Sequence, residues 1–453
     1  MTFTAASLVL ATGALLAFVA LLTPLRRAHA LGDLDSSTIL TFGVAALMTM
    51  PAILVTADGN FTRRFDAFRE LVPVYPSWQP AAVRLGVLMA GLLALVLLIR
   101  RLLLGGVRLH AAGLVAILLW SVAHLSAGLH SQATVTPRGL VLLACLAAAT
   151  VLPRGRGAAL GAGIFGVGLA IASGFAALFR HEVAFVPCRE QCTPLGESLQ
   201  GVLSNENLLG ISLIVAMPFA FLGFRGAARY GFCAYLAAMA VATTSRTAAG
   251  AAVVILAALL LVRPRLDGAR EALGRTAFAA VLLVGAAAGS LMVAEHRWGD
   301  VELTNRPTLW RVASGYIERS PWFGYGPEKW ATLYESSEIP RAAQRTAHNQ
   351  WMDVLFVAGI VGAVLLVVLL AVVIWSAEAA RPGILIAAAA IFLVGTTEGA
   401  WAIGYVDLLS FSLLALLLTG PVAAGSQHVR VRPARTQGRP SPLGPSPAGE
   451  TIP

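Results

Sequence analysis

The stretch TAHNQWMDVLFVAGIVGAVLL, residues 346–366, decides the fold, because it opens an apolar run that is long enough to cross a membrane. The pair His348 and Asn349 stands where this run begins. A titratable imidazole at the start of a transmembrane helix is unusual, and several arginines lie just before it in the sequence. Both features indicate a functional role for this end of the helix. The stretch therefore predicts a membrane helix whose first residues face a polar surface.

The composition of the whole chain also indicates that it lies in a membrane. Of its 453 residues, 57% are apolar and only 12% are charged, whereas a soluble domain carries roughly 25% charged residues. A chain this apolar predicts an integral membrane protein in contact with the lipid bilayer. The net charge of +10 comes almost entirely from arginine, with Lys329 as the only lysine. In a membrane chain this charge does not indicate a nucleic-acid partner.

The apolar runs predict an all-α fold, a polytopic helical bundle with about 12–13 transmembrane helices and one large extracytoplasmic loop that contains short helices. The predicted spans lie near 5–24, 38–57, 81–99, 111–128, 138–152, 158–179, 207–223, 229–245, 247–262, 276–295, 350–375, 384–400 and 405–420. We expect one polytopic membrane domain over residues 1–420. Residues 421–453 are rich in Pro, Gly and Ser and predict a disordered cytoplasmic tail.

The arginines predict which loops are cytoplasmic. They gather in alternate short connections, near 26–27, 100–108, 154–156, 225–229 and 263–275, and again in the tail. Cytoplasmic loops collect Lys and Arg, so the segments 180–206 and 296–349 are predicted to face outward. The expected location is a bacterial inner membrane, with the polar chemistry on the outer face.

The outward segment 296–349 is unusually rich in cations. It carries Arg297, Arg306, Arg311, Arg319, Lys329, Arg341 and Arg345 and leads directly to His348. This enrichment runs against the usual charge preference of outer loops. Binding of an anionic group at the membrane surface would explain it, because guanidinium groups bind phosphate well.

Local structure can be predicted inside that segment, in LTNRPTLWRVASGYIERSPWFGYG (303–326). Thr304 or Asn305 can cap a helix that has Pro307 in its first turn. The helix should end at Ser320-Pro321, since a proline disfavours helical geometry in the residue before it. The following 324–326 sequence, Gly-Tyr-Gly, predicts a turn whose backbone can approach another surface closely.

The four cysteines divide into two pairs. Cys145 and Cys233 lie in apolar runs and are predicted to be packing residues. Cys188 and Cys192 share a polar loop, where a disulfide would form if the loop faces an oxidising compartment. A metal site is the less favoured interpretation there, because His181 is the only other candidate ligand nearby.

Several motifs in this order resemble the O-antigen ligase family, which also includes polysaccharide polymerases and protein oligosaccharyltransferases. They are Ser245-Arg246, the R-x3-W pair Arg306 and Trp310, the P-x-F-G-Y-G of 321–326, and the HN…AGIVG of 348–362. The segment QGVLSNENLLG (200–210), with Asn207 opening a helix, is also similar to that family. The resemblance covers about residues 200–375. Many members carry an acid where this chain has Val357, so the role of that acid is open or moves to Asp353.

The resemblance implies a metal-independent glycosyltransferase of the GT-C type that needs no cofactor. Such an enzyme moves a glycan from an undecaprenyl-diphosphate donor to an acceptor on the outer face of the membrane. Arg246 and Arg306 match the functional arginines of the family, and Arg311 and Arg345 would assist them in holding the diphosphate. His348 is the predicted base, while Asn349 and Asn207 would orient it or the acceptor.

The residues suit this chemistry independently of the resemblance. A diphosphate leaving group gains negative charge as the glycosidic bond breaks, and fixed guanidinium groups would stabilise that charge. A neutral imidazole can take the proton of an attacking hydroxyl group. We expect direct displacement with inversion at the anomeric carbon.

Three alternatives stay open at the sequence level. A surface-polysaccharide polymerase of the same family is one, since the acceptor could be a lipid, a growing glycan or a protein. A metal-dependent glycosyltransferase could use Asp33 and Asp35 of GDLDSS, although that loop is predicted to be cytoplasmic. A transporter or flippase for lipid-linked glycans is the third. Transporters place charges near the bilayer midplane, and here Glu398 is the main charge away from the outer edge.

Overall fold

The structure is a computed structural model that describes residues 5–59, 62–65, 71–131, 135–187, 196–262, 269–296, 298, 303, 306–336, 338–339 and 346–420. Met1–Pro421 form one compact unit. The predicted tail after residue 420, the pair Cys188 and Cys192, and the predicted helix caps Thr304 and Asn305 lie outside the described residues. Cys145 and Cys233 are buried free thiols, which confirms their predicted packing role.

Within those ranges the chain is a helical membrane protein, as the composition predicts. Eight helices are long and apolar enough to cross a bilayer. They are α1 (Ala5–Ala30), α2 (Ser36–Asp58), α3 (Gln79–Leu103), α4 (Ala111–Leu129), α6 (Arg156–Phe179), α8 (Glu206–Gly223), α11 (Ala269–Glu295) and α14 (Gln350–Trp375). Three shorter apolar helices accompany them, α5 (Pro137–Val151), α9 (Ala227–Ala242) and α10 (Arg246–Leu261).

The remaining elements are short and lie between or after the long helices. Two antiparallel hairpins pair β1 (Thr62–Phe65) with β2 (Leu71–Val74), and β3 (Phe185–Pro187) with β4 (Glu197–Leu199). The short helices are α7 (His181–Ala184), η1 (Gly201–Leu203), α12 (Arg306–Arg319), α13 (Lys329–Glu335), η4 (Glu378–Ala380), α15 (Arg381–Val394) and α16 (Ser410–Leu418). The bounds of α12 confirm the helix predicted between Pro307 and Ser320.

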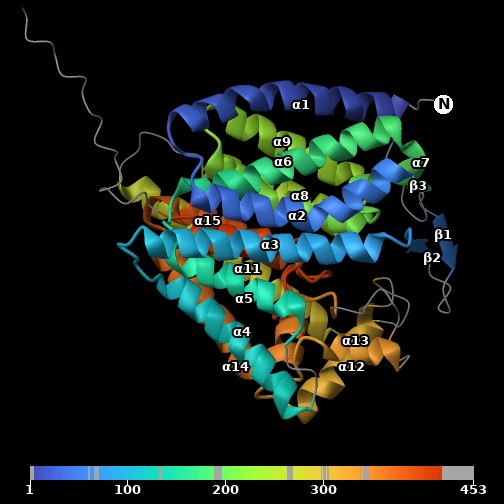
Figure 1. Ribbon diagram of the computed structural model, residues 1–453, viewed down its shortest axis with the longest axis vertical. Coiled ribbons are helices and arrows are strands. Elements are labelled where there is room, and N and C mark those ends of the chain that lie inside the picture. The colour runs from blue at the N-terminus through green and yellow to red at the C-terminus, as the bar shows by residue number, and fades with distance from the viewer. Residues whose placement is uncertain are drawn as a thin grey trace, which may run out of the picture. The chain divides into compact units, whose positions relative to one another are not determined.

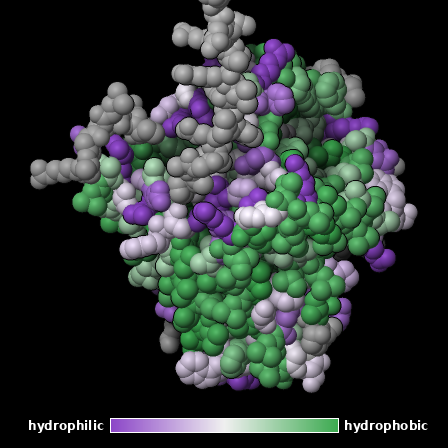
Figure 2. All heavy atoms as spheres, turned by 60° about the vertical axis from the view of Figure 1, so that its left-hand side comes forward, coloured by the Kyte–Doolittle hydropathy of each residue, from purple (hydrophilic) through white to green (hydrophobic). Residues whose placement is uncertain are grey.

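The long helices pack around α6, whose many small residues allow neighbouring backbones to come close. It contacts α1, α2 and α8, and α2 in turn contacts α3 (Figure 1). A second group brings α14 against α4, with α12 and α13 beside it (Figure 1). Large apolar side chains on the outer helices are exposed, and Figure 2 shows a broad apolar area bordered by hydrophilic side chains. This surface suits contact with lipid.

The last two predicted spans, 384–400 and 405–420, are shorter helices in the structure. The helix α15 ends at Val394 and α16 has nine residues. Between them, the chain bonds to the start of α14 instead of continuing as a helix. Gln350 donates its backbone N–H to Gly395 O at 2.8 Å, and its side-chain oxygen accepts from the N–H groups of Ala400 and Trp401. Hydropathy did not predict these shorter helices, because it measures how apolar a segment is and not which distant residues hydrogen-bond to its backbone.

Helix α14, which contains most of the stretch that opened the sequence analysis, is broken at Gly359. This residue has a φ of 64°, in the left-handed region that favours glycine. The 321–326 loop fills the break and bonds to the backbone groups on both sides of it. The four hydrogen bonds are Tyr325 N–H to Phe356 O (2.8 Å), Gly326 N–H to Val357 O (2.9 Å), Ile360 N–H to Pro321 O (2.8 Å) and Val361 N–H to Trp322 O (3.1 Å). Polar backbone groups inside a membrane helix are thereby satisfied.

Two glycines make this docking possible. A Cβ on Gly324 would lie 2.5 Å from Phe356 O, and a Cβ on Gly359 would lie 2.3 Å from the carbonyl carbon of Trp322. Both contacts are far too short for a side chain. The close backbone approach predicted for the Gly-Tyr-Gly turn is confirmed, and its partner is the broken membrane helix.

Substitution Gly359→Ala should therefore destabilise the protein. An alanine at this φ costs about 1–3 kcal/mol, and the clash with Trp322 adds to that cost. We expect a lower midpoint of thermal unfolding for the detergent-solubilised protein. Gly285→Ala in α11 is the matched control, since a Cβ there meets nothing within 4 Å, and it should leave the midpoint unchanged or raise it. Equal unfolding midpoints for Gly359→Ala and the wild type would contradict this account of the break.

Candidate active site

Three ionisable side chains from distant parts of the sequence meet beside the start of α14. The Glu398 carboxylate accepts a hydrogen bond from His348 Nδ1 at 2.7 Å and forms an ion pair with Arg306 Nη2 through its other oxygen. The side chains of Arg306, His348 and Glu398 are 15%, 17% and 9% exposed. We call these three residues the Arg-Glu-His cluster. It is secluded, yet its histidine and arginine still reach the surface.

The backbone of His348 is held in an uncommon conformation. Its φ is 56°, a left-handed value that histidine adopts more readily than most residues. The His348 N–H donates to Thr346 Oγ1 at 3.0 Å. Thr346 in turn donates its hydroxyl to Asp353, and the Ala347 N–H donates to the same carboxylate. Asp353 is buried, so the acid that the sequence analysis singled out fixes the residues immediately before the histidine.

Asn349 fixes the backbone that follows His348. Its side-chain oxygen accepts from the Trp351 and Met352 N–H groups and so caps α14. Its amide nitrogen donates to Ser290 O at 2.9 Å and to Thr396 O at 3.0 Å. Because the side chain is fully buried and uses these backbone partners, Asn349 orients His348 through the chain rather than by touching it.

Helix α12 brings Arg306 to the cluster. Arg306 is its first residue, and one turn later the Trp310 indole donates to Ala347 O at 2.9 Å. The arginine also donates from Nη1 to Leu303 O at 3.1 Å. Its Nε is buried and has no hydrogen-bond partner in the described part of the chain. A guanidinium has five N–H donors, so this group retains capacity to bind a further acceptor.

Glu398 lies in the segment that follows α15, and glycine lets that segment approach. A Cβ on Gly399 would lie 2.3 Å from Thr346 Oγ1 and 2.8 Å from Asp353 Oδ2. Sequence analysis set Glu398 apart as a charge of a late membrane span. The structure instead places it in direct contact with Arg306 and His348. The available signal was an isolated acid in an apolar region, which is costly unless it is paired.

The Glu398 carboxylate also determines the chemistry of the imidazole. Burial by itself lowers the pKa of His348, but the neighbouring carboxylate and its hydrogen bond outweigh burial and raise the pKa above its ordinary value. An ionised carboxylate can only accept, so Nδ1 carries the proton of the neutral ring. Nε2 is then the basic nitrogen. A histidine oriented by a carboxylate in this way is suited to general-base catalysis.

Arg246 lies on a helix whose start is adjacent to the Glu398 segment. It is the first residue of α10, behind the capping side chain of Ser245, and it is exposed. The next residue, Thr247, hydrogen-bonds through its hydroxyl to Thr397, the neighbour of Glu398. The start of α10, which carries Arg246, and the Glu398 segment are therefore adjacent.

The other predicted site residues do not belong to the Arg-Glu-His cluster as the structure describes it. Arg311 lines a cavity of about 500 Å³ together with Trp310 and Met352, while His348 and Arg306 do not line it. Arg345 lies outside the described residues. Asn207 is in the first turn of α8, but Asn205 is the residue that caps this helix, because its side chain accepts from the Leu208 N–H at 2.8 Å.

The two aspartates of the metal-dependent alternative have structural partners. Asp35 is the N-cap of α2 and accepts from the N–H groups of Ser37 and Thr38. Asp33 forms an ion pair with Arg225 at 2.9 Å. Both carboxylates thus contribute to local structure where α2 begins.

Comparison with known proteins finds a family model that is similar to part of the chain. Residues 231–367 match the family model described as O-Antigen ligase. The match includes Arg246, Arg306, Arg311, His348 and Asn349, while Glu398 lies beyond it. No curated protein and no solved structure matches the chain. This match confirms the resemblance drawn from the sequence motifs for residues 231–367 of a helical membrane protein.

Proposed function

We propose that the protein transfers a glycan from an undecaprenyl-diphosphate donor to an acceptor hydroxyl or amine, with the Arg-Glu-His cluster as its catalytic centre. The family match supports a membrane glycosyltransferase of the O-antigen ligase or polymerase type in general. The observation that carries the finer proposal is the Glu398 carboxylate, which holds a potential base and an arginine side by side.

His348 is the base in this mechanism. The acceptor oxygen or nitrogen attacks the anomeric carbon, and its proton passes to Nε2 of the imidazole. Glu398 holds the Nδ1–H, so the ring presents its basic nitrogen and the imidazolium that forms is stabilised. The left-handed backbone at His348 and the flanking bonds of Asp353 and Asn349 keep the ring in place.

Arg306 stabilises the leaving group. As the acceptor bond forms, the bond from the anomeric carbon to the diphosphate oxygen breaks, and that oxygen retains the electron pair. The Arg306 Nε, buried and without a partner in the described ranges, is suited to receive this charge. Glu398 orients the guanidinium through its Nη2. Arg246, Arg311 and Arg345 would hold the remaining phosphate oxygens, and the centre would face the exterior of a bacterial inner membrane.

His348→Gln should abolish most of the transfer. Loss of a general base costs about 10²–10⁴-fold in rate, so we expect kcat to fall by that factor while KM for the donor changes little. The assay supplies purified protein with a lipid-diphosphate oligosaccharide and an acceptor and measures the glycosylated product. His29→Gln, an exposed histidine at the end of α1, is the control and should keep full activity. A fully active His348→Gln variant would remove the proposed base.

The rate should depend on pH through His348. Only the neutral ring accepts a proton, so activity should rise as pH increases through its pKa, with a midpoint above the ordinary value of about 6.5, because Glu398 raises that pKa. Glu398→Gln removes the raising charge. It should move the midpoint to lower pH and reduce the maximal rate. The control Glu335→Gln, at an exposed position on α13, should leave the pH profile unchanged. An unchanged pH profile for Glu398→Gln would show that the carboxylate does not act on the imidazole.

Direct displacement also fixes the stereochemistry of the product. Attack from the face opposite the diphosphate inverts the anomeric carbon, so the new glycosidic bond should have the configuration opposite to that of the donor. Nuclear magnetic resonance coupling constants of the purified product measure this directly. A retained configuration would instead require a covalent glycosyl-enzyme intermediate and would refute single displacement.

A further inference from the structure

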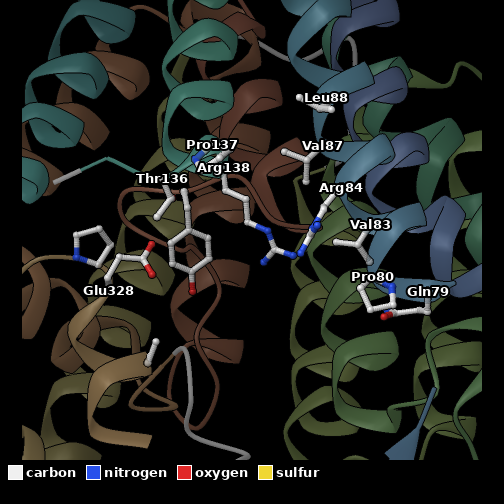
Figure 3. Close-up of a pocket in the computed structure, with 13 residues that line it drawn as sticks. Gln79, Pro80, Val83, Arg84, Val87, Leu88, Thr136, Pro137, Arg138 and Glu328 are labelled. Carbon is white, nitrogen blue, oxygen red and sulfur yellow. The ribbon is translucent and has the colours of Figure 1, made fainter. Parts of the chain in front are cut away.

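A second cavity, of about 620 Å³, lies where the first turns of α3 and α5 approach the start of α13 (Figure 3). Arg246, Arg306, Arg311, His348 and Glu398 are not among its lining residues. The cavity is therefore separate from the Arg-Glu-His cluster, and the proposed function does not account for it.

Two arginines face each other in this cavity. Arg84 comes from α3 and Arg138 from α5, and their guanidinium groups point toward one another (Figure 3). Two guanidinium groups that face the same cavity can together bind the oxygens of one phosphate group. Glu328 lies on the other side of the cavity (Figure 3). The charged lining residues of the cavity are thus two arginines and one glutamate.

The backbone reinforces this charge. Arg84 and Arg138 both lie near the N-terminal ends of their helices, α3 and α5, where the helix dipole favours negative charge. The position of α5 is fixed, because the Thr136 hydroxyl caps it and Arg138 O accepts from the Val406 N–H at 3.1 Å. The charged end of the cavity is thus built on helices rather than on a loop.

The part of the cavity wall that lies along α3 is apolar. Val83, Val87 and Leu88 line the cavity, and Leu88 is also 61% exposed. Leu92, Leu95 and Ile99 continue the exposed row toward the other end of α3, at helical spacings of four, three and four residues. From Leu88 to Ile99 this row spans roughly 16 Å. It is an apolar stripe on a helix long enough to cross a membrane.

We propose that this cavity binds the phosphate head group of a membrane lipid, with Arg84 and Arg138 around the phosphate and the hydrocarbon chain along the α3 stripe. The amphipathic wall selects this ligand class, since two guanidinium groups match a phosphate and the adjoining stripe matches a hydrocarbon chain. The inference does not rest on the proposed function, because the cavity shares no described lining residue with the Arg-Glu-His cluster. It gives the protein a second lipid site.

The test uses the full chain purified in detergent, with dioleoyl phosphatidic acid that carries a photoreactive diazirine in one acyl chain. After irradiation, mass spectrometry locates and quantifies the labelled peptides. We expect labelling of α3 between Leu88 and Ile99. Arg84→Gln and Arg138→Gln should each weaken binding about tenfold, equivalent to about 1.4 kcal/mol. The control Arg100→Gln, an exposed position at the far end of the same helix, should bind like the wild type.

Two competitions separate the possible sources of binding. Dioleoylglycerol, which lacks the phosphate, should not displace the probe, and inorganic phosphate at millimolar concentration should not displace it either. Displacement by inorganic phosphate would mean a site for free phosphate and would overturn the lipid proposal. Equal labelling by a diazirine dioleoylglycerol, or unchanged binding in both arginine variants, would also overturn it.

The labelled position keeps the proposal testable even where a variant does not fold. Wild-type labelling that falls elsewhere than on α3 would be sufficient to reject the site. The labelling measurement needs no glycan transfer. A negative labelling result therefore does not contradict the proposed function, and the labelling can be interpreted even if the protein shows no transferase activity.

Discussion

Glu398 has a carboxylate that is largely withdrawn from water, and such a group is tolerated only with partners that offset its desolvation. Its partners are the Arg306 guanidinium and the His348 imidazole, which come from separate segments of the chain. Removing the carboxylate would leave the arginine without its charged partner and the imidazole without the group that fixes its tautomer. The geometry of the candidate site depends on this one acid, although it lies beyond the segment that matches the family.

The membrane environment explains why the site is assembled from helix ends. A charged group in the middle of an apolar helix is costly, whereas helix ends provide polar backbone groups and access to water. Arg306, Arg246 and His348 all lie at or next to the start of a helix. The break at Gly359 follows the same constraint, because the 321–326 loop supplies hydrogen-bond partners to the interrupted backbone. That loop connects α12 with α13, so it ties the arginine-bearing helix to the membrane helix that follows His348.

The sequence predicted those features that depend on composition and local pattern. The membrane helices, α12 with its bounds and the close approach of the Gly-Tyr-Gly turn are all of this kind. It did not predict that Glu398 contacts His348, because the two residues are 50 positions apart and no local pattern records that contact. The early end of α15 was not predicted for a related reason, since the chain beyond it bonds to Gln350, which is distant in the sequence. Asn207 was predicted to open α8, whereas Asn205, two residues earlier, is the cap, because its side chain accepts from the Leu208 N–H.

The 321–331 segment links the break in α14 with the cavity between α3 and α5. Its first part occupies the break in α14, and Pro327, Glu328 and Ala331 at its end line the cavity between α3 and α5. Gly326 has no room for a side chain, since a Cβ there would lie 2.4 Å from Ala127 Cβ on α4. The 321–326 part of the segment is therefore held between α14 and α4. Because Pro327 and Glu328 follow this part directly, the wall that they form for the cavity is anchored to the same backbone that fills the break in α14.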